Sequence, residues 1–317
     1  MKRFPGIRFV YAALLLPLTY GPARVCNASI LQDDSAAEAS IASKLQARQL
    51  DAALDEARRA VSRSPNSPVL NQLLGVALFK KGMNEEARSA FRRAIQLDPS
   101  VPQNYYNLAL VDLSESKDAD AVPNLQTFMR LDPKNAEGHL LLGRALHNLN
   151  QTEPAIQEFK KALALAPNIP LAHYHLGYAY QSQGDLKEAL EEFKKEITAN
   201  PKFYDAYWLA GNIELGMRNL ENAKTLFQQA IRVKPQGYQA HYGLGSVLLA
   251  QKQWAAAEVE LKTALELKPD EVEAHYALAR VYQQMGRKEN ARTEFVICAK
   301  LNAERQKMKP GIAAQNP

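Results

Sequence analysis

Apolar residues recur at helical spacing through most of the chain, in pairs of stripes separated by short polar turns. Around residue 180, for example, Tyr174, Gly177 and Tyr178 form one stripe, and Leu190 and Phe193 belong to the next. Apolar positions three and four residues apart lie on one face of a helix. The pattern therefore predicts pairs of amphipathic helices, and an all-α protein.

These helix pairs recur with a period of 34 residues. Proline marks one place in seven successive units, at Pro65, Pro99, Pro133, Pro167, Pro201, Pro235 and Pro269. Alanine marks another place in eight units, at Ala53, Ala87, Ala121, Ala155, Ala189, Ala223, Ala257 and Ala291. A period held this long without a slip is not a chance effect of composition. The chain divides into eight repeats at 34–67, 68–101, 102–135, 136–169, 170–203, 204–237, 238–271 and 272–305.

Small residues occur where the two helices of one hairpin face each other. Glycine recurs on the first helix, as at Gly143, opposite the alanine series on the second, and small side chains there allow a close approach of the two backbones. Phenylalanine follows five of the eight alanines by four residues, as at Phe159, on the same helix face. We expect it to fill the gap to the next hairpin. Each proline should end a second helix, because it lacks an N–H and clashes with the preceding turn.

The repeat resembles the tetratricopeptide repeat, a 34-residue helix-turn-helix unit. First helices carry the resemblance in HYHLGYAY, YWLAGNIEL, HYGLGSVLL and HYALARVY, and second helices in EEFKKEITANP and TLFQQAIRVKP. The first, third and last repeats depart from the pattern, with Ala57 for Phe, Phe128 for Ala and Cys298 for Ala. The resemblance implies a right-handed superhelical solenoid of stacked antiparallel helix pairs. Its first helices would line a concave groove that holds a peptide or helix of another protein.

The repeat offsets place aromatic side chains along that groove, with polar ones a helical turn deeper. The predicted partner-binding residues are Tyr106, Tyr174, Trp208, Tyr242 and Tyr276, with Arg144, Tyr178, Asn212 and Arg280 below them. The alternative is that these aromatic residues belong to the repeat pattern and pack between neighbouring hairpins. Towards the N-terminus the same side is apolar, at Val76, Phe79, Leu110, Leu113 and Leu140. That part either grips an amphipathic helix or is core.

Two known modes of groove recognition do not fit the sequence. A Lys and Asn clamp for a terminal carboxylate needs Lys where this chain has Tyr174, Trp208, Tyr242 and Tyr276. An asparagine ladder, known from glycosyltransferase arms, is represented by Asn107 alone.

The outer face of the last repeat is unusual. The two positions after the phenylalanine offset include polar residues in every earlier repeat, as in Lys194 and Lys195, but are Val296 and Ile297 at the end. Terminal repeats ordinarily present a polar outer face. We therefore predict that Val296 and Ile297 are covered by a second copy, giving a homodimer, or by the tail around Ile312. The simpler alternative is a small exposed apolar patch without a partner.

The net charge of +5 is concentrated at the N-terminus. Residues 1–28 hold four of the 39 basic residues and no acidic one, which leaves 35 basic against 34 acidic residues, so the composition does not favour a nucleic-acid partner. Within them an apolar run of about 12 residues follows a cationic start, and a bilayer span needs about 20. We expect a signal peptide at 1–28, a linker at 29–33 and a disordered tail at 306–317, in a periplasmic or secreted protein. An uncleaved membrane anchor is the alternative.

The sequence offers no catalytic motif. His139, His173, His241 and His275 share one repeat offset, where the family carries an aromatic residue, so we expect packing roles for them. No metal-ligand, phosphate-binding or nucleophile motif occurs, and no cofactor is predicted. We therefore expect a non-enzymatic scaffold for protein–protein interactions, in an assembly of the cell envelope. The alternatives are a substrate-presenting arm for a separate enzyme and a self-assembling structural array.

Overall fold

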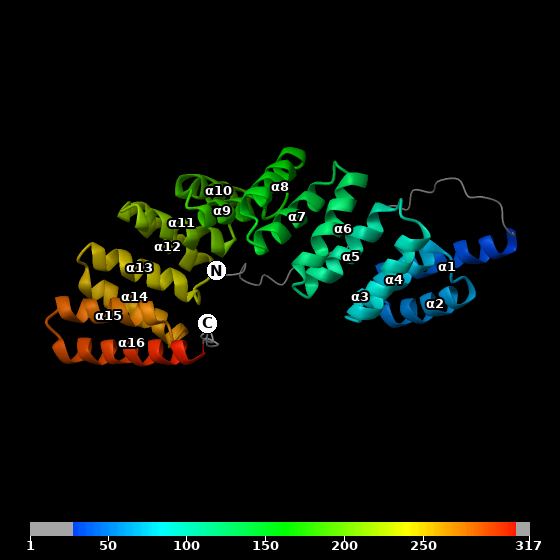
Figure 1. The fold of residues 1–317 in the computed structure, drawn as a ribbon. Coiled ribbons are helices and arrows are strands. Elements are labelled where there is room, and N and C mark those ends of the chain that lie inside the picture. The colour runs from blue at the N-terminus through cyan, green and yellow to red at the C-terminus, as the bar shows by residue number, and fades with distance from the viewer. Residues whose placement is uncertain (1–27, 309–317) are drawn as a thin grey trace, which may run out of the picture. The chain divides into compact units, whose positions relative to one another are not determined.

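The structure is a computed structural model that describes residues 28–308, and these fold as helices joined by short turns (Figure 1). The helices are α1 (Ala28–Gln46), α2 (Leu50–Arg63), α3 (Pro68–Lys80), α4 (Asn84–Leu97), α5 (Pro102–Ser114), α6 (Asp118–Leu131), α7 (Ala136–Asn148), α8 (Thr152–Leu165), α9 (Ala172–Gln183), α10 (Leu186–Ala199), α11 (Tyr204–Gly216), α12 (Leu220–Val233), α13 (Tyr238–Ala250), α14 (Trp254–Leu267), α15 (Val272–Gln284) and α16 (Lys288–Met308). No strand occurs among the described residues, which confirms the all-α prediction. None of these helices is both long enough and apolar enough to span a bilayer.

The chain divides into two compact units, residues 1–169 and 170–317. Within each unit, consecutive helices pack as hairpins, and each second helix also packs on the first helix of the next hairpin. First helices of adjacent repeats are in contact as well, as α11 with α13 and α13 with α15. Each unit is therefore a stack of helix pairs with one layer of first helices.

Sequence signals account for where the helices begin and end. Each second helix before a series proline ends two residues ahead of it, as α2 does at Arg63 before Pro65. Pro68 is the first residue of α3, a position where the missing N–H costs nothing. The side chains of Ser67 and Asn135 accept hydrogen bonds from backbone N–H groups at the starts of α3 and α7.

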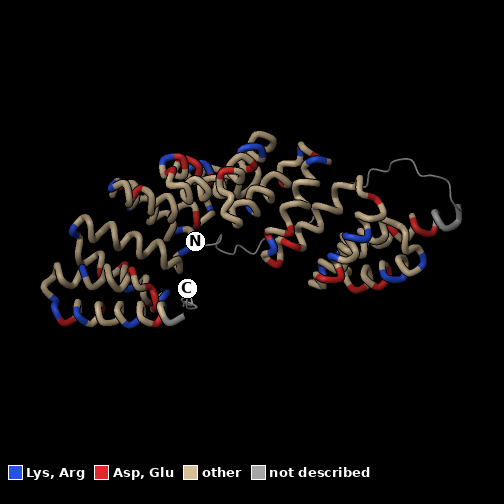
Figure 2. Tube along the Cα trace, viewed as in Figure 1, with Lys and Arg blue, Asp and Glu red and all other residues tan. Residues whose placement is uncertain are grey.

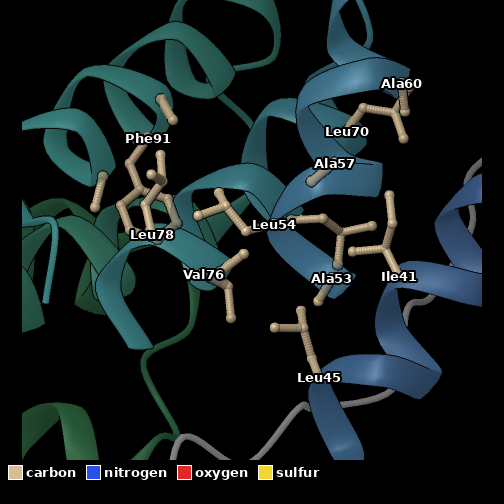
Figure 3. Packing of buried hydrophobic residues seen from close by; sticks show 14 of the residues in the cluster. Ile41, Leu45, Ala53, Leu54, Ala57, Ala60, Leu70, Val76, Leu78 and Phe91 are labelled. Atoms are coloured by element: carbon tan, nitrogen blue, oxygen red, sulfur yellow. The ribbon is translucent and has the colours of Figure 1, made fainter. Parts of the chain in front are cut away.

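The interior consists of side chains from both stripes of each hairpin. Figure 3 shows this for α1–α4, where Ile41, Leu54, Leu70, Leu78 and Phe91 belong to one cluster and Leu78 lies beside Phe91. All five are buried. Helix α1 is the first helix of the described residues, and it packs against α2 and α3.

Glycine of the first helix makes room for the phenylalanine ring of the second. A Cβ added at Gly143 would lie 2.6 Å from Cε1 of Phe159, and one added at Gly211 would lie 2.8 Å from Cε1 of Phe227. The phenylalanine therefore packs inside its own hairpin, which the sequence analysis did not expect. Phe227 also abuts Gly243 of the following hairpin, so the predicted contact between hairpins is present there too.

Two predicted boundaries are wrong where the structure describes them. Helix α1 begins at Ala28 and includes residues 29–33, predicted as a linker, because no glycine or proline interrupts them. Helix α16 continues to Met308, past the predicted start of the tail at 306, because Pro310 is the first residue that stops it. The rest of the tail, Ile312 included, and the predicted signal peptide up to residue 27 lie outside the described residues.

Candidate functional site

A surface hollow of about 550 Å³ lies within the second unit, across the first helices of the last three repeats. We call it the α13/α15 hollow. Its lining residues are Leu215, Gly216, Arg218, Tyr242, Ser246, Leu249, Ala250, Glu273, Tyr276, Ala277 and Arg280. Three predicted partner-binding residues, Tyr242, Tyr276 and Arg280, are among them, so the structure brings these three to one place.

The two tyrosines form the aromatic part of this hollow. Tyr276 is 53% exposed, and its ring meets that of Phe295 edge-on, with 5.8 Å between the ring centroids. Tyr242 is half-buried, and burial raises the pKa of its hydroxyl, which therefore stays protonated at neutral pH. Tyr276 thus offers a ring that other side chains hold in place yet leave accessible.

The repeat period explains why these residues meet. Tyr242 and Tyr276 stand 34 residues apart, at one offset of adjacent first helices, and α13 packs against α15. Arg280 follows Tyr276 by four residues and therefore lies on the same helix face. The sequence analysis missed Leu215, Arg218 and Leu249. They occupy the ends of first helices and the adjoining turn, where the repeat pattern gives no signal.

Tyr174 and Tyr106 are not surface residues, which corrects their prediction as groove contacts. Tyr174 is 0% exposed, and its ring packs against those of Phe193 and Phe203, with centroids 6.2 and 5.0 Å away. Tyr106 is 9% exposed and packs against Phe128, 5.1 Å away. The structure thus supports the alternative, packing within the repeats, for these two residues.

Four other predicted residues are half-buried and do not line the hollow. Trp208 donates its indole N–H to Asp205 on the same helix, at 2.8 Å. Tyr178 lies beside Tyr174, with 6.2 Å between ring centroids. Asn212 is in α11, and Arg144 belongs to the first unit. No one site unites these four residues with the α13/α15 hollow.

The apolar side chains predicted along the first unit are mostly core. Val76, Leu110 and Leu140 are buried, and Phe79 and Leu113 are half-buried. The burial of Val76, Leu110 and Leu140 supports the alternative that they belong to the interior. They are therefore not free to grip an amphipathic helix in this conformation.

A second hollow, of about 380 Å³, lies on the outer face of the last hairpin. We call it the α16 hollow. Its lining residues are Gln283, Lys288, Ala291, Arg292, Phe295, Val296 and Ala299. Val296 is 62% exposed, and Ile297 beside it is half-buried and does not line the hollow. In the preceding repeat the places of Arg292 and Val296 are held by Glu258 and Lys262, which contact Tyr282 of the next hairpin. The α16 hollow thus corresponds to the seat of a following first helix.

Four of the six histidines, those at the shared repeat offset, link structural elements. Each ring places Nδ1 against a glutamate 19 residues later, in the pairs His139–Glu158, His173–Glu192, His241–Glu260 and His275–Glu294, at 2.5 to 2.7 Å. Nε2 of His241 lies 2.9 Å from the carbonyl oxygen of Pro235, and the Glu260 carboxylate raises the pKa of His241. Asn71 and Tyr207 donate to the equivalent proline carbonyls. Side chains at this offset therefore tie a first helix to the turn before it, which is the packing role that their shared offset predicts.

Buried carboxylates are a feature that the sequence analysis missed. Asp112 accepts a hydrogen bond from Arg88 at 2.9 Å, and burial raises the pKa of Asp112. Glu214 occupies the same offset three repeats later and accepts from Asn219 and Lys194. These acids link neighbouring helices. Within residues 28–308, no three His, Cys, Asp or Glu side chains are grouped so as to hold a metal ion.

The stacked helix pairs define a helical repeat protein. Family models described as TPR repeat match residues 75–113, 143–184 and 245–286, and models described as tetratricopeptide repeat match 170–203, 208–261 and 272–305. Together these matches cover more than half of the chain. The chain therefore belongs to the tetratricopeptide repeat family, whose members generally serve as scaffolds that bind other proteins.

Several solved structures share the fold. YrrB, described as a TPR protein with an unusual peptide-binding site, is 23% identical with a TM-score of 0.53, over 62% of this chain and 97% of YrrB. The hetero-tetramer Cut9–Hcn1 of the APC/C is 20% identical with a TM-score of 0.55, and the match covers 76% of this chain and 48% of that chain. MamA from Desulfovibrio magneticus RS-1, residues 41 to the end, is 25% identical with a TM-score of 0.50, and the match covers 54% of this chain and 96% of MamA. Comparison with curated proteins gave no match.

Proposed function

We propose that the chain is a non-enzymatic scaffold that binds a peptide or helix of a partner protein in the α13/α15 hollow. The observation that carries this proposal is the accessible ring of Tyr276 beside Tyr242 and Arg280, on first helices, where the family generally binds its partners. Tyrosine and arginine are among the side chains that most often dominate binding energy at protein interfaces. The apolar side chains of Leu215 and Leu249 add a surface that a partner would desolvate.

Truncation of both tyrosines tests this proposal. We expect the Tyr242→Ala, Tyr276→Ala double variant to lose at least one partner by about 30-fold, or about 2 kcal/mol, in quantitative mass spectrometry of proteins captured from the native source. Tyr238→Ala is the matched control, because Tyr238 lies on the same helix, α13, but outside the hollow. Equal capture by the double variant and the wild type, with unchanged helix content, would rule out the hollow as the binding site.

We also propose that the outer face of α16 forms a homodimer. Met308 lies about 18 Å along the helix axis from Val296, at about 1.5 Å per residue. Ile312 of the tail lies outside the described residues, so its coverage of Val296 is tested below by removal of the tail. We favour a second copy because Val296 is exposed beside a hollow on the same face, and a twofold axis would place each Val296 against the hollow of the other copy.

Charge favours an antiparallel pairing of two α16 helices in that dimer. Basic and acidic residues alternate along α16 (Figure 2). On the helix face that carries the hollow, however, Lys288 and Arg292 lie near the start of α16. The exposed Ala303 and Gln306 lie near the end of α16. An antiparallel pair sets the basic side chains against uncharged ones, whereas a parallel pair sets like charges together.

Sedimentation over a range of concentrations tests the dimer. The wild type should pass from monomer to dimer, and Val296→Glu with Ile297→Lys should remain monomeric. Val259→Glu is the control, since Val259 is also 62% exposed but lies on α14, away from the hollow. Removal of residues 309–317 should leave the dimer intact. A wild type that stays monomeric, or one that grows beyond the dimer, would contradict this contact.

We further propose that the chain acts outside the cytoplasm, in the periplasm or as a secreted protein, and contributes to an assembly of the cell envelope. The support is the sequence of residues 1–28, with its cationic start and short apolar run. Cell fractionation with determination of the mature N-terminus should find the protein exported and shortened near Ala28. A full-length protein in the membrane fraction would indicate the anchored alternative, and a cytoplasmic protein would contradict export.

A further inference from the structure

Two arginines face the α13/α15 hollow without a counter-ion. Among residues 28–308, neither the Arg218 nor the Arg280 side chain has a hydrogen-bond or ion-pair partner, and both are exposed. By contrast, Arg88 binds Asp112 and Glu115, and Arg287 binds Glu258. Two unpaired guanidinium groups on the rim of one hollow give it a local positive charge.

One carboxylate, Glu273, also lines this hollow, and it pairs with Arg305 from α16 at 3.7 Å. The charged side chains that line the hollow are therefore two basic and one acidic, which leaves it a net positive charge. The other polar groups, Ser246 and the Tyr242 hydroxyl, are uncharged at neutral pH. The hollow therefore combines two available cations with tyrosine rings and the apolar side chains of Leu215 and Leu249.

We infer that the α13/α15 hollow recognises an acidic peptide segment, in which a carboxylate lies within a few residues of an apolar or aromatic side chain. This inference rests on the proposed function and names the chemistry of its partner. The carboxylate binds the guanidinium of Arg280 or Arg218, which present paired N–H donors suited to two carboxylate oxygens. The apolar side chain packs against Tyr276 and Leu249.

This arrangement differs from the Lys and Asn clamp that the sequence lacks. That clamp would place its lysine at the offset of Tyr242 and Tyr276. Here the cations are Arg280, four residues after Tyr276 on α15, and Arg218, in the loop after α11. Because both arginines are solvent-exposed, salt should screen their attraction for the ligand, and binding should weaken as ionic strength rises.

A random-peptide display library, panned on the full chain, provides the probe. Enriched peptides should contain Asp or Glu near an apolar residue, and synthetic copies with Asn and Gln in their place should bind about tenfold more weakly or worse. Copies with an amidated C-terminus distinguish a terminal carboxylate from a side-chain one. Weaker binding after removal of either kind of carboxylate supports the inference. Arg218→Gln with Arg280→Gln should cause a similar loss, whereas Arg232→Gln, an exposed arginine on α12, should cause none.

The outcomes separate this inference from the proposed function. Peptides that need Tyr242 and Tyr276 but tolerate loss of their carboxylates would overturn the acidic preference and leave the binding site in place. Peptides that bind equally well to the Tyr242→Ala, Tyr276→Ala variant would overturn both. Circular dichroism of each variant shows whether a loss of binding comes from unfolding.

Discussion

Tyr174 and Tyr276 hold the same position in two repeats of one unit, yet one is core and the other is surface. Tyr174 is enclosed by Phe193 of its own hairpin and by Phe203, which precedes the next first helix. Tyr276 has the ring of Phe295 on one side, and among the described residues no repeat follows its hairpin. The position in the repeat thus fixes where a tyrosine points, and the neighbouring hairpin decides whether a partner can reach it.

Truncation to alanine should show the largest difference between the two tyrosines. Tyr174→Ala removes a wholly buried ring, so we expect a loss of about 3–5 kcal/mol in the free energy of unfolding. Tyr276→Ala should cost less than about 1 kcal/mol, because half of its side chain is already in water. Urea denaturation followed by circular dichroism measures both. Similar losses at the two positions would contradict the assignment of core and surface.

Removal of the hydroxyl alone sharpens the comparison. The Tyr174 hydroxyl is buried without a hydrogen-bond partner, which ordinarily costs about 1–3 kcal/mol. We expect Tyr174→Phe to raise the free energy of unfolding by about 1 kcal/mol and Tyr276→Phe to leave it unchanged. Thermal denaturation of the two variants beside the wild type tests this expectation. A destabilised Tyr174→Phe would indicate that the hydroxyl has a partner.

A smaller, pH-dependent effect should come from Glu196, beneath Tyr174. Glu196 occupies the small-residue offset of α10, where other repeats have Ala162 and Ala230, and it accepts the backbone N–H of Tyr174 at 3.3 Å. Burial raises the pKa of its carboxyl above the ordinary 4.5. Stability is therefore lost as pH rises from about 4.5 through the folded-state pKa.

The variant Glu196→Gln keeps an oxygen acceptor for Tyr174 and removes the charge. We expect it to be more stable than the wild type at pH 7 by about 1 kcal/mol, with the difference vanishing below about pH 4.5. Melting temperatures across this pH range give the result. Glu192→Gln should behave differently, because Glu192 is ion-paired with His173 and Lys195, and its pKa is lowered. A pH-independent gain at Glu196 would show that its charge is not the cause.

The sequence predicted the fold well because the same pattern of apolar stripes and prolines recurs every 34 residues. The period located the helices and their ends, and three of the residues that line the α13/α15 hollow. It failed where a single contact overrides the pattern, as when Phe203 covers Tyr174 or Phe128 covers Tyr106. It also gave no signal for Arg218, which lies in a turn, or for the buried pair of Arg88 with Asp112, which joins residues from two repeats.

Site-specific photo-cross-linking in the native source tests the central claim, that the α13/α15 hollow is the partner-binding surface. A photoreactive phenylalanine would replace Tyr276 in one variant and Val259 in another, since both side chains are largely exposed and only Tyr276 lines the hollow. We predict that a defined segment of another protein is cross-linked from position 276 and not from 259. Absence of an adduct at 276, or the same adducts from both positions, would contradict the claim.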